Sequence, residues 1–148
     1  MTARVTERDP NNLQRFVDAQ HGTFRNALAE LERGRKETHW MWFVFPQLRG
    51  LGSSSTAVFY SIASLDEALC YMSHPLLGPR LREALGAIMA WAGRRSAEQI
   101  LGAIDAMKLR SSLTLFEQAE PAVFAPALDA FFGGERDERT LALLNAWR

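Results

Sequence analysis

The sequence predicts an all-α protein, built as a single compact domain of about seven helical segments joined by short turns. Apolar residues recur at three- and four-residue steps along most of the chain, and helix-capping residues stand where these patterns begin or end. The length of 148 residues suits one domain, and 47% hydrophobic with 23% charged residues is typical of a packed core. We therefore expect a helical domain over residues 9–148, preceded by a disordered tail over residues 1–8.

The first helix is predicted after the start signal Asp9-Pro10-Asn11. Apolar residues follow at helical spacing from Leu13 to Leu31, which indicates one amphipathic helix of about five turns. Gly34 is suited to the C-terminal cap of this helix.

The next segment, HWMWFVF, is short and wholly apolar, so periodicity fits both a strand and a helix. Thr38 can cap a helix here and Pro46 would end it, and we therefore favour a helix. The following RGLGSSS stretch is rich in glycine and serine, which predicts a loop. Residues 56–62 carry no decisive pattern.

Capping patterns mark the helices of the remaining chain. Ser64 and Ser96 each precede Glu or Gln by three residues, as in a capping box. Asp105 and Asp137 are further start signals, and Pro121 fits the first turn of a helix. The predicted helices cover residues 64–72, 76–91, 96–102, 105–117, 121–132 and 137–148.

Charge and apolar runs exclude several classes of protein. Lys plus Arg equals Asp plus Glu at 17 each, and the basic residues are scattered, which disfavours binding to duplex nucleic acid. The polar stretch MTARVTERDP lacks the apolar core of a signal peptide, so none is expected. No apolar run approaches the roughly 18 residues of a membrane span. The lone Cys70 cannot form an intramolecular disulfide, so a cytoplasmic location is expected. Its apolar surroundings predict that it is buried.

Metal and cofactor motifs are missing from the sequence. The three histidines are far apart and no HxxxH or CxxC spacing occurs, so we expect no metal. Neither GxGxxG nor the P-loop pattern occurs, and no cofactor is indicated.

The aromatic segment is the leading candidate for function. Four large aromatic residues lie within six positions, and burial in the core is one interpretation of them. Polar residues and the Gly-Ser loop flank this run, which favours a ligand pocket over residues 36–55. Aromatic walls suit a base ring, and a loop rich in donors suits phosphate. The candidate ligand-binding residues here are Lys36, Trp40, Trp42, Gln47, Arg49, Gly52 and Ser53.

Further candidates lie on neighbouring segments. Lys108 and Ser111 fall on one side of the helix predicted over 105–117, where they could hold an anion, although a solvated face is the simpler interpretation. His39 could act as a general acid or base because imidazole titrates near neutrality, and Glu30 could activate water.

Five stretches of the chain resemble the uncharacterised bacterial family known as domain of unknown function 1810. They are NLQRFVDAQ, ALAELERGRKETHWMWFVFPQLRGLG, SHPLLGPRL, DAMKLRSSLTLF and FFGGERDERTLALL. The resemblance covers residues 9–146 and implies a compact helical domain, with little about activity. Relatives are sometimes labelled calpastatin, which fits poorly because such inhibitors are extended and disordered.

A fainter similarity links KLRSSLTLF, FAPALDAFF and GGERDERTL to the C-terminal elements of the NADAR family. It implies a ligand related to ADP-ribose, although the closing Asp-x-x-Trp-Gly motif of that family is absent here.

Two functions follow from these patterns. The first is binding or processing of a nucleotide-like or ADP-ribose-like small molecule at the aromatic and polar pocket. The alternative is a protein–protein interaction module, in which the aromatic segment forms a groove or patch for a protein partner or a second copy of the chain. A concave pocket with converging polar groups favours the first, and a broad exposed apolar patch favours the second.

Overall fold

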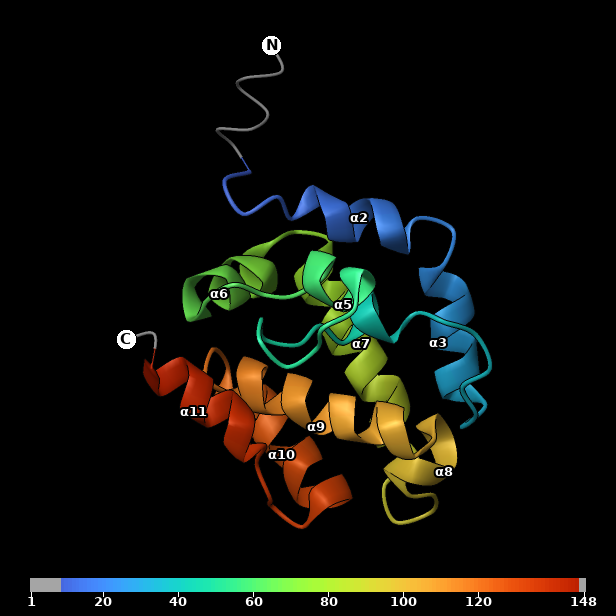
Figure 1. Ribbon diagram of the computed structural model, residues 1–148. Coiled ribbons are helices and arrows are strands. Elements are labelled where there is room, and N and C mark those ends of the chain that lie inside the picture. Colours follow the sequence, from blue (N-terminus) through green and yellow to red (C-terminus); the bar gives the residue numbers. More distant parts are fainter. Residues whose placement is uncertain (1–8, 147–148) are drawn as a thin grey trace.

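The longest helix, α9, lies in the middle of the computed structural model, which describes residues 9–146 (Figure 1). It packs against α6, α8, α10 and α11, while α7 packs against α3, α6 and α10, and α2 packs against α4. Ten helices lie within the described residues: α2 (Gln14–Gln20), α3 (Phe24–Glu32), α4 (Met41–Val44), α5 (Ser55–Phe59), α6 (Leu65–Ser73), α7 (Leu77–Met89), α8 (Ala97–Leu101), α9 (Ala103–Glu117), α10 (Pro121–Phe132) and α11 (Glu138–Ala146).

A chain of aromatic rings runs through the core and joins helices that are distant in sequence. Phe16 of α2 meets Tyr71 of α6 edge-on, with ring centroids 5.2 Å apart. Tyr71 lies 5.3 Å from Phe116 of α9, which lies 5.7 Å from Phe124 of α10. All four rings are buried. Edge-on and tilted contacts suit the charge distribution of aromatic rings, so this chain stabilises one continuous core.

The predicted all-α class is confirmed, because residues 9–146 form a single helical domain without a strand. Leu48 and Ile62 form an isolated parallel bridge between two loops. No helix in this part of the chain is long and apolar enough to cross a membrane. The expected disordered tail over residues 1–8 lies outside the described residues.

The predicted number of helices, about seven, is wrong. The single helix expected from Leu13 to Leu31 is two helices, α2 and α3, separated by a turn in which Gly22 has φ of +74°. Apolar spacing continues across this turn, so periodicity could not reveal it. Helix α5 accounts for a further difference, since it lies in the stretch left without a decisive pattern.

Several predicted helix boundaries are confirmed. The Ser64 and Ser96 hydroxyls accept hydrogen bonds from backbone N–H groups three residues on, and Ser96 forms a complete capping box. Asp137 accepts a bond from the Thr140 N–H at the start of α11. Gly34 follows α3 with φ of +73°, and a Cβ there would lie 2.6 Å from the Trp91 ring, which requires glycine.

Two predicted start signals are wrong. Helix α4 begins after Trp40, and the Thr38 hydroxyl donates to Glu30 rather than capping the helix. Asp105 lies inside the first turn of α9, which begins after Gly102. In both cases the polar side chain pairs with a charged residue from another part of the chain: Thr38 with Glu30, and Asp105 with Lys36.

The predicted burial of Cys70 is also wrong, because its side chain is exposed on α6. The buried face of α6 contains two adjacent pairs of residues, Glu67 with Ala68 and, one helical turn later, Tyr71 with Met72. Cys70 falls between these pairs and faces away from the core.

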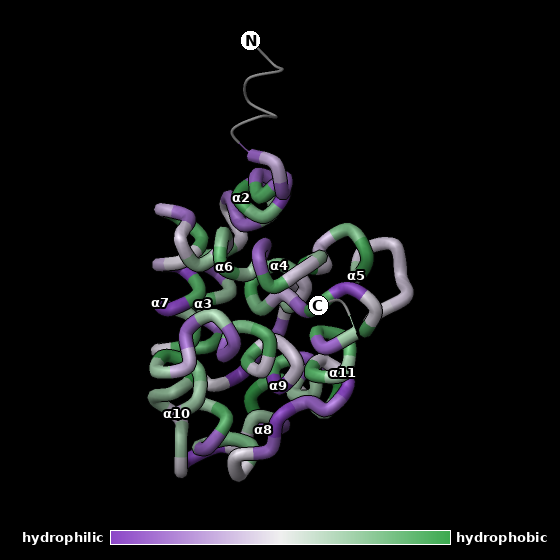
Figure 2. Tube along the Cα trace, turned by 90° about the vertical axis from the view of Figure 1, so that its left-hand side faces the viewer, coloured by the Kyte–Doolittle hydropathy of each residue, from purple (hydrophilic) through white to green (hydrophobic). Residues whose placement is uncertain are grey.

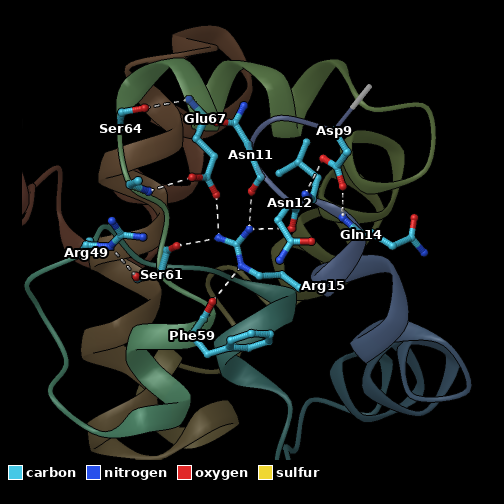
Figure 3. Close-up of polar contacts among 12 residues, drawn as sticks. Asp9, Asn11, Asn12, Gln14, Arg15, Arg49, Phe59, Ser61, Ser64 and Glu67 are labelled. Atoms are coloured by element: carbon cyan, nitrogen blue, oxygen red, sulfur yellow. Dashed lines mark hydrogen bonds and ion pairs between the residues drawn. The ribbon is translucent and has the colours of Figure 1, made fainter. Parts of the chain in front are cut away.

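A buried arginine ties the N-terminal helix to the middle of the chain (Figure 3). The guanidinium of Arg15 carries five N–H donors, and all five are used. They donate to the carbonyls of Asn11 (2.6 Å), Asn12 (2.7 Å), Phe59 (2.8 Å) and Ser61 (2.8 Å) and to the carboxylate of Glu67 (2.7 Å).

Glu67 completes this network from the first turn of α6. Its second oxygen accepts the Ala63 N–H at 3.1 Å, and both charged side chains are buried. Since a buried ion pair is tolerated only when its hydrogen bonds are satisfied, this geometry fixes α2 against the segment that precedes α6.

Replacing Arg15 with Met should destabilise the fold by about 3–5 kcal/mol, because it leaves the Glu67 carboxylate buried without its counter-ion. Urea denaturation followed by circular dichroism would measure this. The control is Arg82→Met, which breaks the more exposed pair with Glu120 and should cost about 0–1 kcal/mol. Equal losses in the two variants would contradict the structural role of Arg15.

Candidate functional site

A large open cleft of about 1080 Å³ lies beside the central helix, and we call it the α9 cleft. Its walls come from α4 and the loop after it, from α5, from α9, from the segment between α10 and α11, and from the first turn of α11. The lining residues are Trp42, Gln47, Leu51, Gly52, Ser53, Ser54, Ala57, Ile104, Met107, Lys108, Arg110, Ser111, Gly134, Glu135, Arg136, Asp137, Glu138 and Arg139.

One face of α9 forms the floor of the cleft. Ile104, Met107, Lys108 and Ser111 are spaced by three and four residues, so they share a side of the helix. Ile104 and Met107 are 73% and 62% exposed. Although Met107 is apolar, it therefore faces the cleft and not the core.

The Gly-Ser loop forms the opposite wall and rests against α11. Gly52 lies so close to Ala57 that a Cβ there would be 2.7 Å from the alanine Cβ, and the Ser54 hydroxyl caps α5. The guanidinium of Arg139 reaches the Leu51 carbonyl at 3.4 Å. Figure 2 shows this pale loop on the same side of the molecule as α11. Close approach of the loop backbone to α5 therefore depends on glycine.

The chain has two lysines, and Asp105 contacts both of them. The Lys36 ammonium lies 2.9 Å from the Asp105 carboxylate, and the Lys108 ammonium lies 3.7 Å from it. Each ammonium also lies 5.2 Å from the centre of a tryptophan ring, Lys36 over Trp40 and Lys108 over Trp42. Two lysine–tryptophan cation–π pairs therefore lie on either side of Asp105, beside the start of α9.

A second hollow of about 460 Å³ adjoins the α9 cleft, and we call it the Lys36 pocket. The two share Trp42, Ile104 and Lys108, so the Trp42–Lys108 pair forms the ridge between them. The remaining lining residues are Lys36, His39, Trp40, Met41, Leu101, Gly102, Ala103 and Asp105.

The structure brings most of the residues proposed from the sequence to these two hollows. The α9 cleft contains Trp42, Gln47, Gly52, Ser53, Lys108 and Ser111, the Lys36 pocket contains Lys36, His39 and Trp40 together with the shared residues, and neither contains Arg49 or Glu30.

Arg49 lies outside the cleft because of its position in the loop bridge. Its backbone N–H donates to the Ile62 carbonyl at 2.8 Å, and its Nε donates to the Ser61 hydroxyl at 3.3 Å. The side chain therefore lies beside the Arg15 network (Figure 3) rather than among the cleft residues.

Glu30 is a buried anchor for the segment that precedes α4. Its carboxylate accepts the N–H groups of Glu37 (2.6 Å) and Thr38 (2.9 Å), the Thr38 hydroxyl and the Trp40 indole N–H (3.0 Å). Burial raises the pKa of this carboxyl, but the four hydrogen bonds outweigh it and lower the pKa from 4.5 to about 2. A carboxylate engaged in this way is a weak base, so we leave Glu30 out of the proposed chemistry.

The aromatic segment is divided between core and cleft. Trp40, Phe43 and Phe45 are buried, as the core interpretation of this run expected. Trp42 is half-buried and lines both hollows. It is therefore the aromatic residue of this segment with a ring available in the α9 cleft.

Three arginines of the cleft were not among the residues proposed from the sequence: Arg110, Arg136 and Arg139. Arg136 donates through Nε and Nη2 to the two oxygens of Glu117, and this hydrogen bonding raises the pKa of Arg136. Arg136 and Arg139 reach the cleft only because the end of the α10–α11 connection and the first turn of α11, respectively, lie beside it. The charged run GGERDER was the one sequence signal for these two residues.

The fold and the cleft define an all-helical domain with an open, mixed polar and aromatic hollow beside its central helix. The model of the family described as "protein of unknown function (DUF1810)" matches residues 10–144, and the chain belongs to this family. Neither this match nor the other comparisons show the similarity to the NADAR family.

A solved structure is closely similar to the whole domain. It is titled as the crystal structure of the conserved hypothetical protein Rv1873 from Mycobacterium tuberculosis. The sequences are 52% identical, the match covers 93% of this chain and 99% of that one, and the TM-score is 0.89. No curated protein matches the chain significantly.

Glu30→Gln should destabilise the protein by about 2–3 kcal/mol near neutral pH, because the amide turns its own donors toward those of Thr38 and Trp40. Because the pKa of Glu30 is lower in the folded state, its ionised carboxylate stabilises the fold fully above about pH 4.5. This stabilisation is lost as the pH falls toward about 2 and the carboxylate is protonated. The difference between wild type and variant should therefore shrink from about pH 5 to about pH 3.

Urea denaturation at several pH values would measure this difference. The matched control is Glu32→Gln, an exposed carboxylate on the same helix, which should change stability little at any pH. If Glu30→Gln lowers the stability by the same amount at every pH, the proposed role of the Glu30 carboxylate as a buried anchor is wrong.

Proposed function

We propose that the α9 cleft binds a small molecule that carries both a flat ring and an anionic group, of the nucleotide or ADP-ribose type. The observation that supports this most is the pair formed by Trp42 and Lys108 on the ridge of the cleft. Small-molecule sites combine apolar and aromatic walls with a few placed polar groups, and this cleft has that composition.

The aromatic and charged parts of such a ligand have separate partners in the cleft. A ring stacks on Trp42, which is the half-buried aromatic side chain of the wall. A phosphate attached to that ring then lies near the Lys108 ammonium, 5.2 Å from the indole centre. Ser53 and Ser111 offer hydroxyl groups from the loop and from α9, respectively.

His39 can contact a ligand only if the ligand extends past the Trp42–Lys108 ridge into the Lys36 pocket. It is exposed and lines the Lys36 pocket rather than the α9 cleft. A role for His39 in proton transfer therefore applies to the part of a ligand that enters this second hollow.

Burial of the aromatic segment weighs against the interaction-module alternative. That alternative requires the segment to form an exposed groove or patch, whereas Trp40, Phe43 and Phe45 lie in the core. The small-molecule proposal needs only Trp42 at the cleft surface.

A thermal-shift titration with ADP-ribose, NAD and nucleotides tests the proposal. A ligand at about 100 times its dissociation constant adds about 2.7 kcal/mol of stability, a shift of about 5–10 °C for a chain of this size. The shift should disappear in Lys108→Gln and in Trp42→Leu, and Trp42→Phe should retain part of it. Arg33→Gln, which removes an exposed cation outside both hollows, is the control. A flat wild-type screen would overturn the proposal.

The presence of only two lysines allows the site to be located by acylation. A limiting acylating reagent should label Lys108, and a bound ligand should protect it by about tenfold at 90% occupancy. Lys36, held at 2.9 Å by Asp105, serves as the internal reference. Peptide mass spectrometry measures both sites. Selective protection of Lys36 would move the ligand to the Lys36 pocket, and protection of neither would contradict the proposal.

A further inference from the structure

Arg110 is an arginine of the α9 cleft whose donors are incompletely used. It projects from α9, its side chain is 30% exposed, and its Nε is buried. This Nε has no hydrogen-bond partner within residues 9–146. Buried donors are nearly always paired, so an unpaired guanidinium nitrogen in the wall of a cleft needs an explanation.

Two other arginines, Arg15 in the core and Arg136 in the cleft, show what a structural role looks like in this fold. Arg15 uses all five donors on carbonyls and a carboxylate. Arg136, in the same cleft as Arg110, holds Glu117 with two nitrogens and the Gly134 carbonyl with the third. Arg110 lacks such a set of partners, and its position therefore serves something other than holding the chain together.

The ion partner of Arg110 is loosely held. Glu135 Oε2 lies 3.6 Å from Arg110 Nη1, which is beyond hydrogen-bond distance, and the Glu135 side chain is 77% exposed. Glu135 follows Gly133 and Gly134, whose φ values are +60° and +82°. Exposed ion pairs of this geometry contribute little, so a better anion can replace the carboxylate.

We propose that Arg110 is the residue of the α9 cleft that binds the phosphate group of the ligand, and that Glu135 is an internal carboxylate which this phosphate displaces. The inference rests on the proposed function and specifies which residue binds the anionic group of the ligand. A guanidinium offers Nε and a neighbouring Nη to two oxygens of one phosphate, which completes the donors that Arg110 leaves unused.

The charge of the cleft favours phosphate over a single carboxylate. Lys108 and Arg110 both line the cleft, and Lys108 lies 3.7 Å from Asp105, which Lys36 holds more closely. Arg136 is already matched by Glu117. Arg139 reaches the Leu51 carbonyl, so Lys108 and Arg110 are the cleft cations that remain for a phosphate group. Such a group carries about −1.5 to −2 charges at neutral pH.

Titration with inorganic pyrophosphate tests this assignment, because the probe has no ring and its binding does not need Trp42. The Arg Nε–H resonances in a ¹H–¹⁵N spectrum report directly on the nitrogen in question, and calorimetry gives the affinity. Arg110→Gln should weaken binding about 10- to 100-fold, and Arg110→Lys should restore only part of it. Glu135→Gln should tighten binding about two- to fivefold.

The control is Arg82→Gln, an arginine paired with Glu120 outside the cleft, which should bind pyrophosphate as the wild type does. Unchanged binding in Arg110→Gln, unchanged binding in Glu135→Gln, or equal binding of succinate by the wild type would overturn the assignment. If pyrophosphate fails while nucleotides still give a thermal shift that is lost in Trp42→Leu, the phosphate assignment is overturned and the proposed function stands. If both fail, both are overturned.

Discussion

The carboxylate of Glu30 sits inside the protein with a lowered pKa and accepts hydrogen bonds from a segment seven to ten residues further along the chain. A buried charge is tolerated only when its lone pairs are satisfied, so residues 37–40 have little freedom to move. Their fixed position buries the Trp40 indole beneath Lys36 and starts α4 at Met41. Trp42 follows one residue later and is thereby directed to the ridge between the two hollows.

Helix α9 belongs both to the core and to the cleft, because its opposite sides face different surroundings. Leu109, Leu113 and Phe116 are buried in the core, where Phe116 joins the chain of aromatic rings. The other side carries Lys108 and Ser111 into the cleft. Since the core holds the helix rigidly, the cleft residues on it keep a fixed geometry, and rigid placement of polar groups is what ligand recognition requires.

Local sequence patterns predicted the helical class and the residues of the site that are close to the aromatic segment. Trp42, Gly52 and Lys108 could be proposed because aromatic runs, glycine loops and helical spacing are visible in the chain itself. Contacts between distant segments could not be predicted. The turn at Gly22, the bond from Thr38 to Glu30, and the approach of Arg136 to the cleft all depend on tertiary structure.

The most direct test of this account is a backbone ¹H–¹⁵N correlation spectrum recorded while ADP-ribose is added to the intact protein. The account predicts that shifts concentrate on the loop over residues 51–54, on α9 around Lys108 and Ser111, and on residues 134–136. Helix α2, which carries Arg15 and lies away from α9 and α11 (Figure 1), should stay unchanged. Shifts confined to other surfaces, or no shifts at millimolar ligand, would contradict the account.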